Sequence, residues 1–102
     1  MKQYREIENS LGEGSYKAPK GLIRVRISTK GSTISEITIS GDFFMYPEDL
    51  LWKLEKTLLG ADATREAILS RVQDFYRSTR ALTPGVAPQD FSEAVMRALS
   101  SV

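Results

Sequence analysis

The sequence contains no cysteine and no histidine among its 102 residues. These absences exclude disulfides, cysteine or histidine metal sites, haem ligation, and the Ser–His and Cys–His pairs of nucleophilic catalysis. A glycine-rich phosphate loop is missing too, because Gly12 and Gly14 are followed by Ser15 and Tyr16 and no Gly-Lys-Ser/Thr sequence is present. We therefore expect no catalytic residue, no metal site, and no cofactor bound by this chain alone.

Acidic pairs are the remaining candidates for holding a hard cation. They are Glu48 with Asp49 and Asp90 with Glu93, and each pair stands where the sequence predicts the start of a helix. Acidic side chains there stabilise the positive end of the helix dipole. This pattern favours a structural role for both pairs.

The chain also lacks a strong net charge and a long apolar run. Its formal charge of +1 provides no attractive field for nucleic acid or an anionic membrane, and no stretch is long enough to span a bilayer. We therefore expect a cytoplasmic protein without nucleic-acid or membrane partners, folded as a single domain over residues 1–102. The first 30 residues carry seven basic and three acidic side chains, a balance suited to an anionic partner or ligand.

Alternating isoleucine and valine residues predict two antiparallel strands, around residues 22–28 and 37–40. Residues 11–15 are predicted to form a loop, and residues 16–18 a short extended piece that ends at a proline. Ile34 falls out of phase with the second strand. We expect it to be exposed, or to lie in a bulge beside the turn.

The turn between these strands is predicted at residues 30–32. A three-residue loop there places Val25 opposite Ile37 on the buried face and Arg26 opposite Glu36 on the exposed face. A shift by one residue would set apolar side chains against charged ones, so this register is favoured.

Three helices are predicted in the second half of the chain. The first begins with Pro47 and stops at Gly60, the second begins near Thr64, and the third begins at Pro88. Their predicted buried stripes are Leu50, Leu51, Leu54 and Leu58, then Ile68, Val72 and Phe75, then Phe91, Val95, Ala98 and Leu99. Strands followed by helices indicate an α+β fold, a small antiparallel sheet with helices packed on one face.

Two adjacent phenylalanines follow the second strand. Phe43 continues the inward phase of that strand, whereas Phe44 points the other way and either packs under a helix start or lies exposed as a partner surface would require. For Asp42, hydrogen bonds to backbone amides in the turn are favoured over catalysis.

Four blocks of this sequence resemble a known family. They are residues 17–25 (KAPKGLIRV), the turn at Lys30 and Gly31, residues 37–44 (ITISGDFF), and a helix that closes with residues 58–60 (LLG). Together they look like the C-terminal accessory domain of lipoate–protein ligases, and the resemblance covers roughly residues 15 to 100 in the same order of elements. The GDFF block is its most specific part.

The resemblance implies both a fold and a function. The family's small domain is similar in fold to the scaffold proteins of iron–sulfur cluster assembly (SufE/NifU-like), although the absence of cysteine excludes a cluster-carrying role. Because the large domain is missing here, the chain resembles the small subunit of a two-chain ligase, non-catalytic on its own. The resemblance implies a heterodimer with a large catalytic subunit that uses ATP, Mg²⁺ and lipoate to form lipoyl-AMP and to modify a lysine of lipoyl-domain acceptor proteins.

Candidate site residues follow from the two kinds of side chain that remain unexplained. Phe44, Tyr46 and Trp52 are candidates for the interface with a large subunit, because aromatic residues outside the buried stripes are typical interface anchors. Asp42 is grouped with them as an interface candidate. Lys17 and Lys20, on either side of a proline, are candidates for facing the nucleotide of the complex. The alternative function is a non-enzymatic adaptor that binds a protein partner on the same scaffold.

Overall fold

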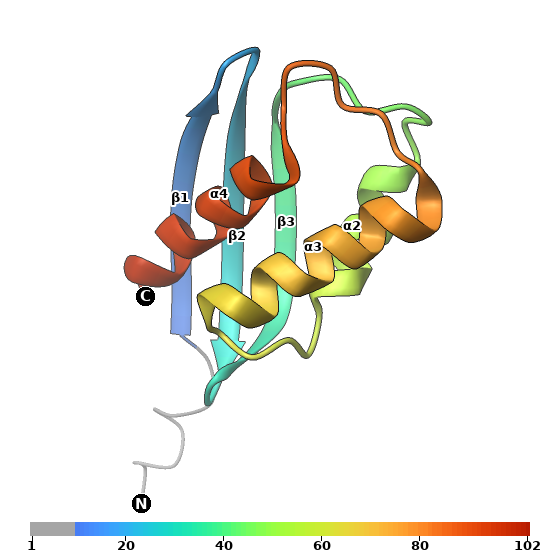
Figure 1. Ribbon diagram of the computed structural model, residues 1–102. Coiled ribbons are helices and arrows are strands. Elements are labelled where there is room, and N and C mark those ends of the chain that lie inside the picture. The colour runs from blue at the N-terminus through green and yellow to red at the C-terminus, as the bar shows by residue number, and fades with distance from the viewer. Residues whose placement is uncertain (1–9) are drawn as a thin grey trace, which may run out of the picture.

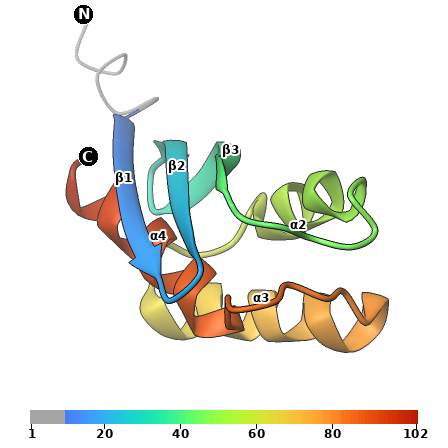
Figure 2. The same ribbon diagram turned by 90° about the horizontal axis from the view of Figure 1, so that it is seen from above.

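The computed structural model describes residues 10–102. An antiparallel sheet, in the order β1-β2-β3, is built from β1 (Ser10–Ala18), β2 (Gly21–Lys30) and β3 (Thr33–Asp42). Three helices follow: α2 (Leu50–Leu58), α3 (Arg65–Thr79) and α4 (Pro88–Ser100). The helices lie on one side of the strands, and α2 stands beside β3 (Figures 1 and 2). The predicted α+β class, with helices on one face of a small sheet, is confirmed.

The strand register differs from the predicted one by two residues. Val25 pairs with Ile39 instead of Ile37, and Arg26 faces Thr38 instead of Glu36. The turn accounts for one of these residues, because it contains two residues and Lys30 pairs directly with Thr33. The bulge at Ser35, described below, accounts for the other. A two-residue turn brings the strands together earlier than the predicted three-residue loop. The same face of each strand remains buried, because a shift of two preserves the alternation.

A bulge in β3 accounts for Ile34. Ser28 pairs with Glu36 and Thr29 with Ile34, so Ser35 is an extra residue between these two pairs. An extra residue inverts the alternation of the strand, which turns Ile34 towards the core, where it is 1% exposed. The predicted bulge is confirmed, and the predicted exposure is wrong.

Strand β1 replaces a predicted loop. Residues 11–15 pair with β2 along their whole length. Their two glycines face α4: a Cβ added at Gly12 would lie 2.3 Å from the Ala98 carbonyl oxygen, and one at Gly14 would lie 2.4 Å from the Ala98 nitrogen. Here glycine permits a close approach of strand and helix, where the sequence pattern suggested a flexible segment.

The helix starts were predicted with unequal success. Helix α3 begins after Thr64, whose hydroxyl accepts a hydrogen bond from the Ala67 nitrogen at 3.2 Å, and α4 begins at Pro88 as predicted. Helix α2 begins three residues later than predicted, because the Pro47 carbonyl accepts from the Leu50 nitrogen at 3.1 Å in a turn that precedes the helix.

A single core lies between the sheet and the helices. Helix α4 packs on β1 and β2, and α3 packs on α4 and α2. The stripe positions of α3 are fully buried, as are Leu54 and Leu58 of α2, whereas Leu50 and Leu51 are only half-buried. The largest buried side chains are Phe75, Phe91, Ile23, Ile34, Leu54, Leu58 and Ile68.

Candidate functional site

The chain beyond β3 keeps the alternation of a strand. Phe43 turns inward and meets the Phe91 ring edge to face at 5.2 Å between centroids, and Met45 is buried. Phe44 and Tyr46 turn outward, and their rings stack at 6.3 Å with an angle of 3° between the planes. Phe44 is 68% exposed. The predicted inward position of Phe43 is confirmed, and Phe44 lies on the surface.

A leucine from a distant loop joins these two aromatic residues. The Tyr46 nitrogen donates to the Leu82 carbonyl at 2.9 Å, and the Leu82 nitrogen donates to the Tyr46 carbonyl at 3.0 Å. Residues that exchange both hydrogen bonds in this way carry their side chains on the same side of the backbone. Leu82 is 65% exposed. We call Phe44, Tyr46 and Leu82 the apolar patch.

The apolar patch occupies the end of the molecule where three loops meet. Figure 1 shows the β1–β2 hairpin, the segment between β3 and α2, and the segment between α3 and α4 at this end. The Lys20 nitrogen in the hairpin donates to the Gly85 carbonyl at 3.1 Å. Its aliphatic chain lies against Gly85, where an added Cβ would fall 2.2 Å from the Lys20 Cβ. Lys20 is therefore held at the same end as the patch.

Hydrogen bonds fix the loop that supplies Leu82. The Thr83 hydroxyl donates to the Val86 carbonyl at 2.8 Å and shares a second hydrogen bond with the Tyr76 hydroxyl, also at 2.8 Å. Burial raises the pKa of the Tyr76 phenol above its ordinary value. The phenol thus stays protonated at neutral pH and can hold the loop against α3.

The two candidate lysines are separated by the fold. Lys17 belongs to the alternate residues of β1 that point away from the helices, and it is exposed on the open face of the sheet. Lys20 lies beyond this strand, against the loop that precedes α4. Their closeness in sequence therefore does not place both amines at one site.

Two further candidates lie outside the patch. Trp52 is 75% exposed on α2, and Asp42 is exposed at the end of β3. A shallow depression beneath Phe44 and Tyr46 is lined by neighbouring residues that include Leu51 of α2, whereas Trp52 takes no part in it. An interface role for Trp52 and Asp42 remains a prediction.

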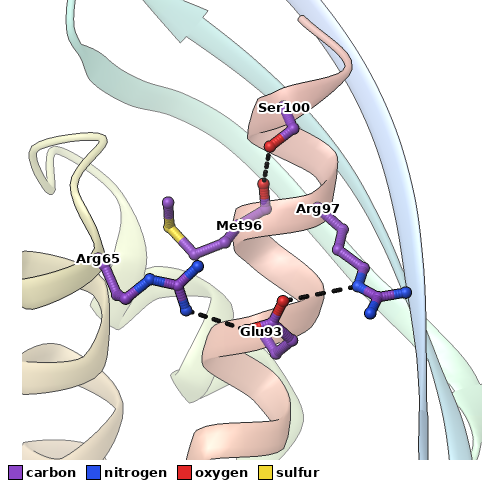
Figure 3. Close-up of polar contacts among 5 residues, drawn as sticks. All are labelled: Arg65, Glu93, Met96, Arg97 and Ser100. Atoms are coloured by element: carbon purple, nitrogen blue, oxygen red, sulfur yellow. Dashed lines mark hydrogen bonds and ion pairs between the residues drawn. The ribbon is translucent and has the colours of Figure 1, made fainter.

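The acidic residues of α4 have structural partners. The Asp90 carboxylate accepts a hydrogen bond from the Ala87 nitrogen at 2.7 Å, which caps the helix. The Glu93 carboxylate lies between Arg65 of α3, at 2.9 Å, and Arg97 one turn along α4, at 3.6 Å (Figure 3). Asp90 lies in the first turn of α4, as predicted, whereas Glu93 lies beyond that turn and is held by ion pairs instead. Within residues 10–102, no three acidic side chains gather in a way that could hold a metal ion.

In the part of the chain that the structure describes, no helix combines the length and apolar character needed to cross a bilayer. On the open face, Arg26 forms its ion pair with Glu13 of β1 at 2.9 Å, and not with Glu36 as predicted. The two-residue change of register explains this correction, because Arg26 lies opposite Glu13 and Thr38.

Comparison with known proteins supports one family. The family described as bacterial lipoate protein ligase C-terminus matches residues 13–95. The protein named lipoate-protein ligase A subunit 2 of Thermoplasma acidophilum is 47% identical over 81 residues, which are 79% of this chain and 83% of that protein.

A solved structure agrees with this match. It is described as an archaeal lipoylation system, a bi-partite lipoate protein ligase and its E2 lipoyl domain from Thermoplasma acidophilum. One of its chains aligns with a TM-score of 0.79 and 44% identity, over 85% of this chain and 96% of that one.

The family match covers most of the residues that the structure describes, and the curated relative covers more than two thirds of the chain. The resemblance drawn from the four sequence blocks is therefore confirmed, while the similarity to iron–sulfur scaffold proteins remains a prediction. The chain belongs to the family of the lipoate–protein ligase C-terminal domain.

Proposed function

We propose that this chain is the accessory subunit of a two-chain lipoate–protein ligase and forms a heterodimer with a large catalytic subunit. The observation that carries the proposal is the match to a relative that is itself named a second subunit, over 83% of that relative's length. The matched chain of the bi-partite ligase is likewise covered almost completely, at 96%.

The proposed reaction has two steps, and ATP, Mg²⁺ and lipoate are held in the complex. The lipoate carboxylate attacks the α-phosphorus of ATP, which gives lipoyl-AMP and releases pyrophosphate. A lysine amine of a lipoyl-domain protein then attacks the acyl carbonyl and releases AMP. We assign this chain to the first step, where it completes and orders the site of the large subunit.

The apolar patch is the surface that we propose for contact with the large subunit. It combines two stacked aromatic rings with a leucine, the side-chain types that anchor protein interfaces. Backbone hydrogen bonds between Tyr46 and Leu82 hold it in place before binding. A patch that is already ordered loses less conformational entropy on association.

The patch also suggests how docking would help adenylation. Closure of an apolar surface over a reaction site excludes water, and this strengthens the electrostatic stabilisation of charge that develops at the phosphates. Lys20 stands at the same end of the molecule and would add a cation at the edge of the contact.

Exchange of radioactive pyrophosphate into ATP, measured in the presence of lipoate, tests the proposal. The measurement is made with the large subunit alone, with this chain alone, and with both. We expect exchange to require both chains. Full exchange by the large subunit alone, unchanged by adding this chain, would contradict the proposal and favour the adaptor.

A further inference from the structure

One face of the sheet is not covered by helices. Figure 2 shows α3 and α4 on one side of the three strands and, within residues 10–102, no element on the other. The side chains on this open face come from alternate residues of each strand, and the register fixes which of them are neighbours. Two arginines of β2, Arg24 and Arg26, stand at its centre.

The two arginines have different surroundings. Arg26 is neutralised by Glu13, whose carboxylate it contacts at 2.9 Å. Arg24 lies directly opposite Ser15 on β1 and Ser40 on β3, so both of its cross-strand neighbours are hydroxyls. Within residues 10–102, Arg24 forms no ion pair, and neither serine hydroxyl forms a hydrogen bond.

We propose that Arg24, Ser15 and Ser40 form a binding site for a phosphate-type oxyanion. Directly opposed residues in an antiparallel sheet have Cβ atoms about 4.5–5.5 Å apart, so Ser15 and Ser40 flank Arg24 in a single row across the strands. A guanidinium presents donors in a planar fork that matches two oxygens of a phosphate, and hydroxyls add donors at each side. The three groups also line one shallow depression.

The charges around this row favour an anion of modest affinity. Lys17 follows Ser15 by two residues on the same face and adds a positive charge, whereas Asp42 follows Ser40 by two residues and adds a negative one. The Glu13 carboxylate, which borders the depression, is already paired with Arg26. Because the site is open to solvent, we expect a millimolar dissociation constant.

This inference does not depend on the proposed ligase function, because it is drawn from the register and the charges alone. A phosphate oxyanion can come from two sources. One is a free inorganic anion, either phosphate or pyrophosphate, and the other is the phosphate chain of a nucleotide. The test therefore compares inorganic phosphate, pyrophosphate and ATP as separate probes, each added at constant ionic strength.

Nuclear magnetic resonance of the full-length chain provides the readout, through the Arg24 side-chain Nε–H signal and the amides of Ser15 and Ser40. We expect saturable shifts with pyrophosphate and about tenfold weaker binding in Arg24→Gln. The Ser15→Ala, Ser40→Ala double variant should also bind more weakly. Lys53→Gln, which removes an exposed cation of α2, is the matched control and should bind as the unchanged protein does.

Each outcome decides the proposal. Equal affinity for pyrophosphate and ATP would support a site that reads the phosphates alone, and saturation by ATP only would overturn it in favour of recognition of the nucleoside. An absence of saturable signal shifts with pyrophosphate at constant ionic strength would overturn it as well. So would shifts of the Ser15 and Ser40 amides that persist unchanged in Arg24→Gln. A spectrum with native dispersion shows that each variant is folded.

Discussion

Arg71 shows how one side chain can join two helices. Its guanidinium donates from one nitrogen to the carbonyls of Thr57 and Leu59, at 3.0 and 3.1 Å, at the C-terminal end of α2. The last carbonyls of a helix have no partner within it, and a cation there also meets the negative end of the helix dipole. Arg71 thus anchors the short helix α2 to α3.

Replacing Arg71 by methionine should remove these bonds while keeping an apolar chain of similar length. We expect the free energy of unfolding to fall by about 1–2 kcal/mol, measured by urea denaturation. Arg77→Met is the matched control, because within residues 10–102 Arg77 forms an ion pair with Asp74 alone, on the exposed side of α3. This variant should lose less than about 1 kcal/mol. Equal losses in the two variants would contradict the role assigned to Arg71.

Glu93 makes the stability of the protein depend on pH. The hydrogen bond from Arg65, with a further contribution from Arg97, holds the pKa of this carboxyl below its ordinary value. A carboxyl with a lowered pKa in the folded state stabilises the fold above its unfolded pKa, about 4.3 for glutamate, and this contribution is lost as the pH falls through the lower folded value.

Glu93→Gln should therefore be less stable than the unchanged protein at neutral pH, and the difference should shrink as the pH is lowered below about 4. Thermal unfolding followed by circular dichroism across this range measures the difference. A gap that stays constant with pH would show that the Glu93 carboxylate contributes no charge-dependent stability.

The two candidate lysines can now be tested one at a time. Changing Lys17 and Lys20 together to glutamine should lower lipoate-dependent pyrophosphate exchange by about tenfold, which corresponds to about 1.4 kcal/mol. Lys20→Gln should carry most of this loss, because Lys20 lies at the end of the molecule that holds the apolar patch. Lys17→Gln serves as the comparison on the open face of the sheet.

Transfer of lipoate from pre-made lipoyl-AMP separates a charge effect from a docking defect. A cation that stabilises charge on the phosphates acts only while ATP is being cleaved. Transfer should therefore keep its rate in all three lysine variants. An equal loss in exchange and transfer would indicate weaker binding of the subunits, and no loss in either would make these lysines ordinary surface residues.

At the scale of the element, β1 depends on glycine for its contact with α4. A Cβ at Gly14 would lie 2.4 Å from the Ala98 nitrogen and 2.6 Å from the Arg97 carbonyl carbon. Both are backbone atoms, so relief requires the whole helix to move. Gly14→Ala should lower the free energy of unfolding by about 1–3 kcal/mol in urea denaturation.

The neighbouring residue supplies the control for this prediction. Ser15 lies on the same strand but points to the open face, so Ser15→Ala should change stability by less than about 0.5 kcal/mol. If Gly14→Ala were as stable as Ser15→Ala, the close packing of strand and helix would not be a requirement of the fold.

The elements that sequence alone could predict were those with a regular hydrophobic period. The alternation in β2 and the stripes of α3 and α4 place each element and its buried face correctly. Residues 11–15 of β1 were not predicted as a strand, because the inward positions there are Gly12 and Gly14, which add no hydrophobic signal. The register between β2 and β3 was predicted wrongly, because it depends on a bulge at Ser35 and a two-residue turn. Both follow from strand pairing, which local periodicity does not encode.

The candidate site also contains residues that the sequence could predict and residues that it could not. The outward position of Phe44 followed from alternation along one strand and could be read from the sequence. Leu82 could not, because backbone hydrogen bonds between distant segments bring it beside Tyr46. Lys17 and Lys20 were grouped because they are close in sequence, but the strand and the hairpin place them on different surfaces.

The whole molecule keeps its core separate from its candidate contact surfaces. The core is enclosed between the sheet and the helices, while the apolar patch lies on loops at one end and the proposed oxyanion site lies on the open face. Side chains in either surface can therefore be truncated without opening a cavity in the core. This separation lets binding and folding be measured independently.

Phe44→Ala and Leu82→Ala should each weaken the one-to-one complex with the large subunit by about 1–3 kcal/mol, measured by calorimetry. Both residues are mostly exposed, at 68% and 65%, so circular dichroism should show an unchanged fold. Leu11→Ala is the matched control, because Leu11 is a similarly exposed leucine, at 74%, that lies on β1 outside the apolar patch. Trp52→Ala tests in the same assay whether α2 adds a second anchor.

The two readouts distinguish the possible errors in this assignment. If Phe44→Ala unfolded, the ring would contribute to the fold, contrary to its exposure. If both patch variants bound as tightly as Leu11→Ala, the large subunit would dock elsewhere, and the stacked rings would need another explanation. Loss of binding in Leu82→Ala is the more demanding result, because only the backbone pairing of Leu82 with Tyr46 places this leucine in the patch.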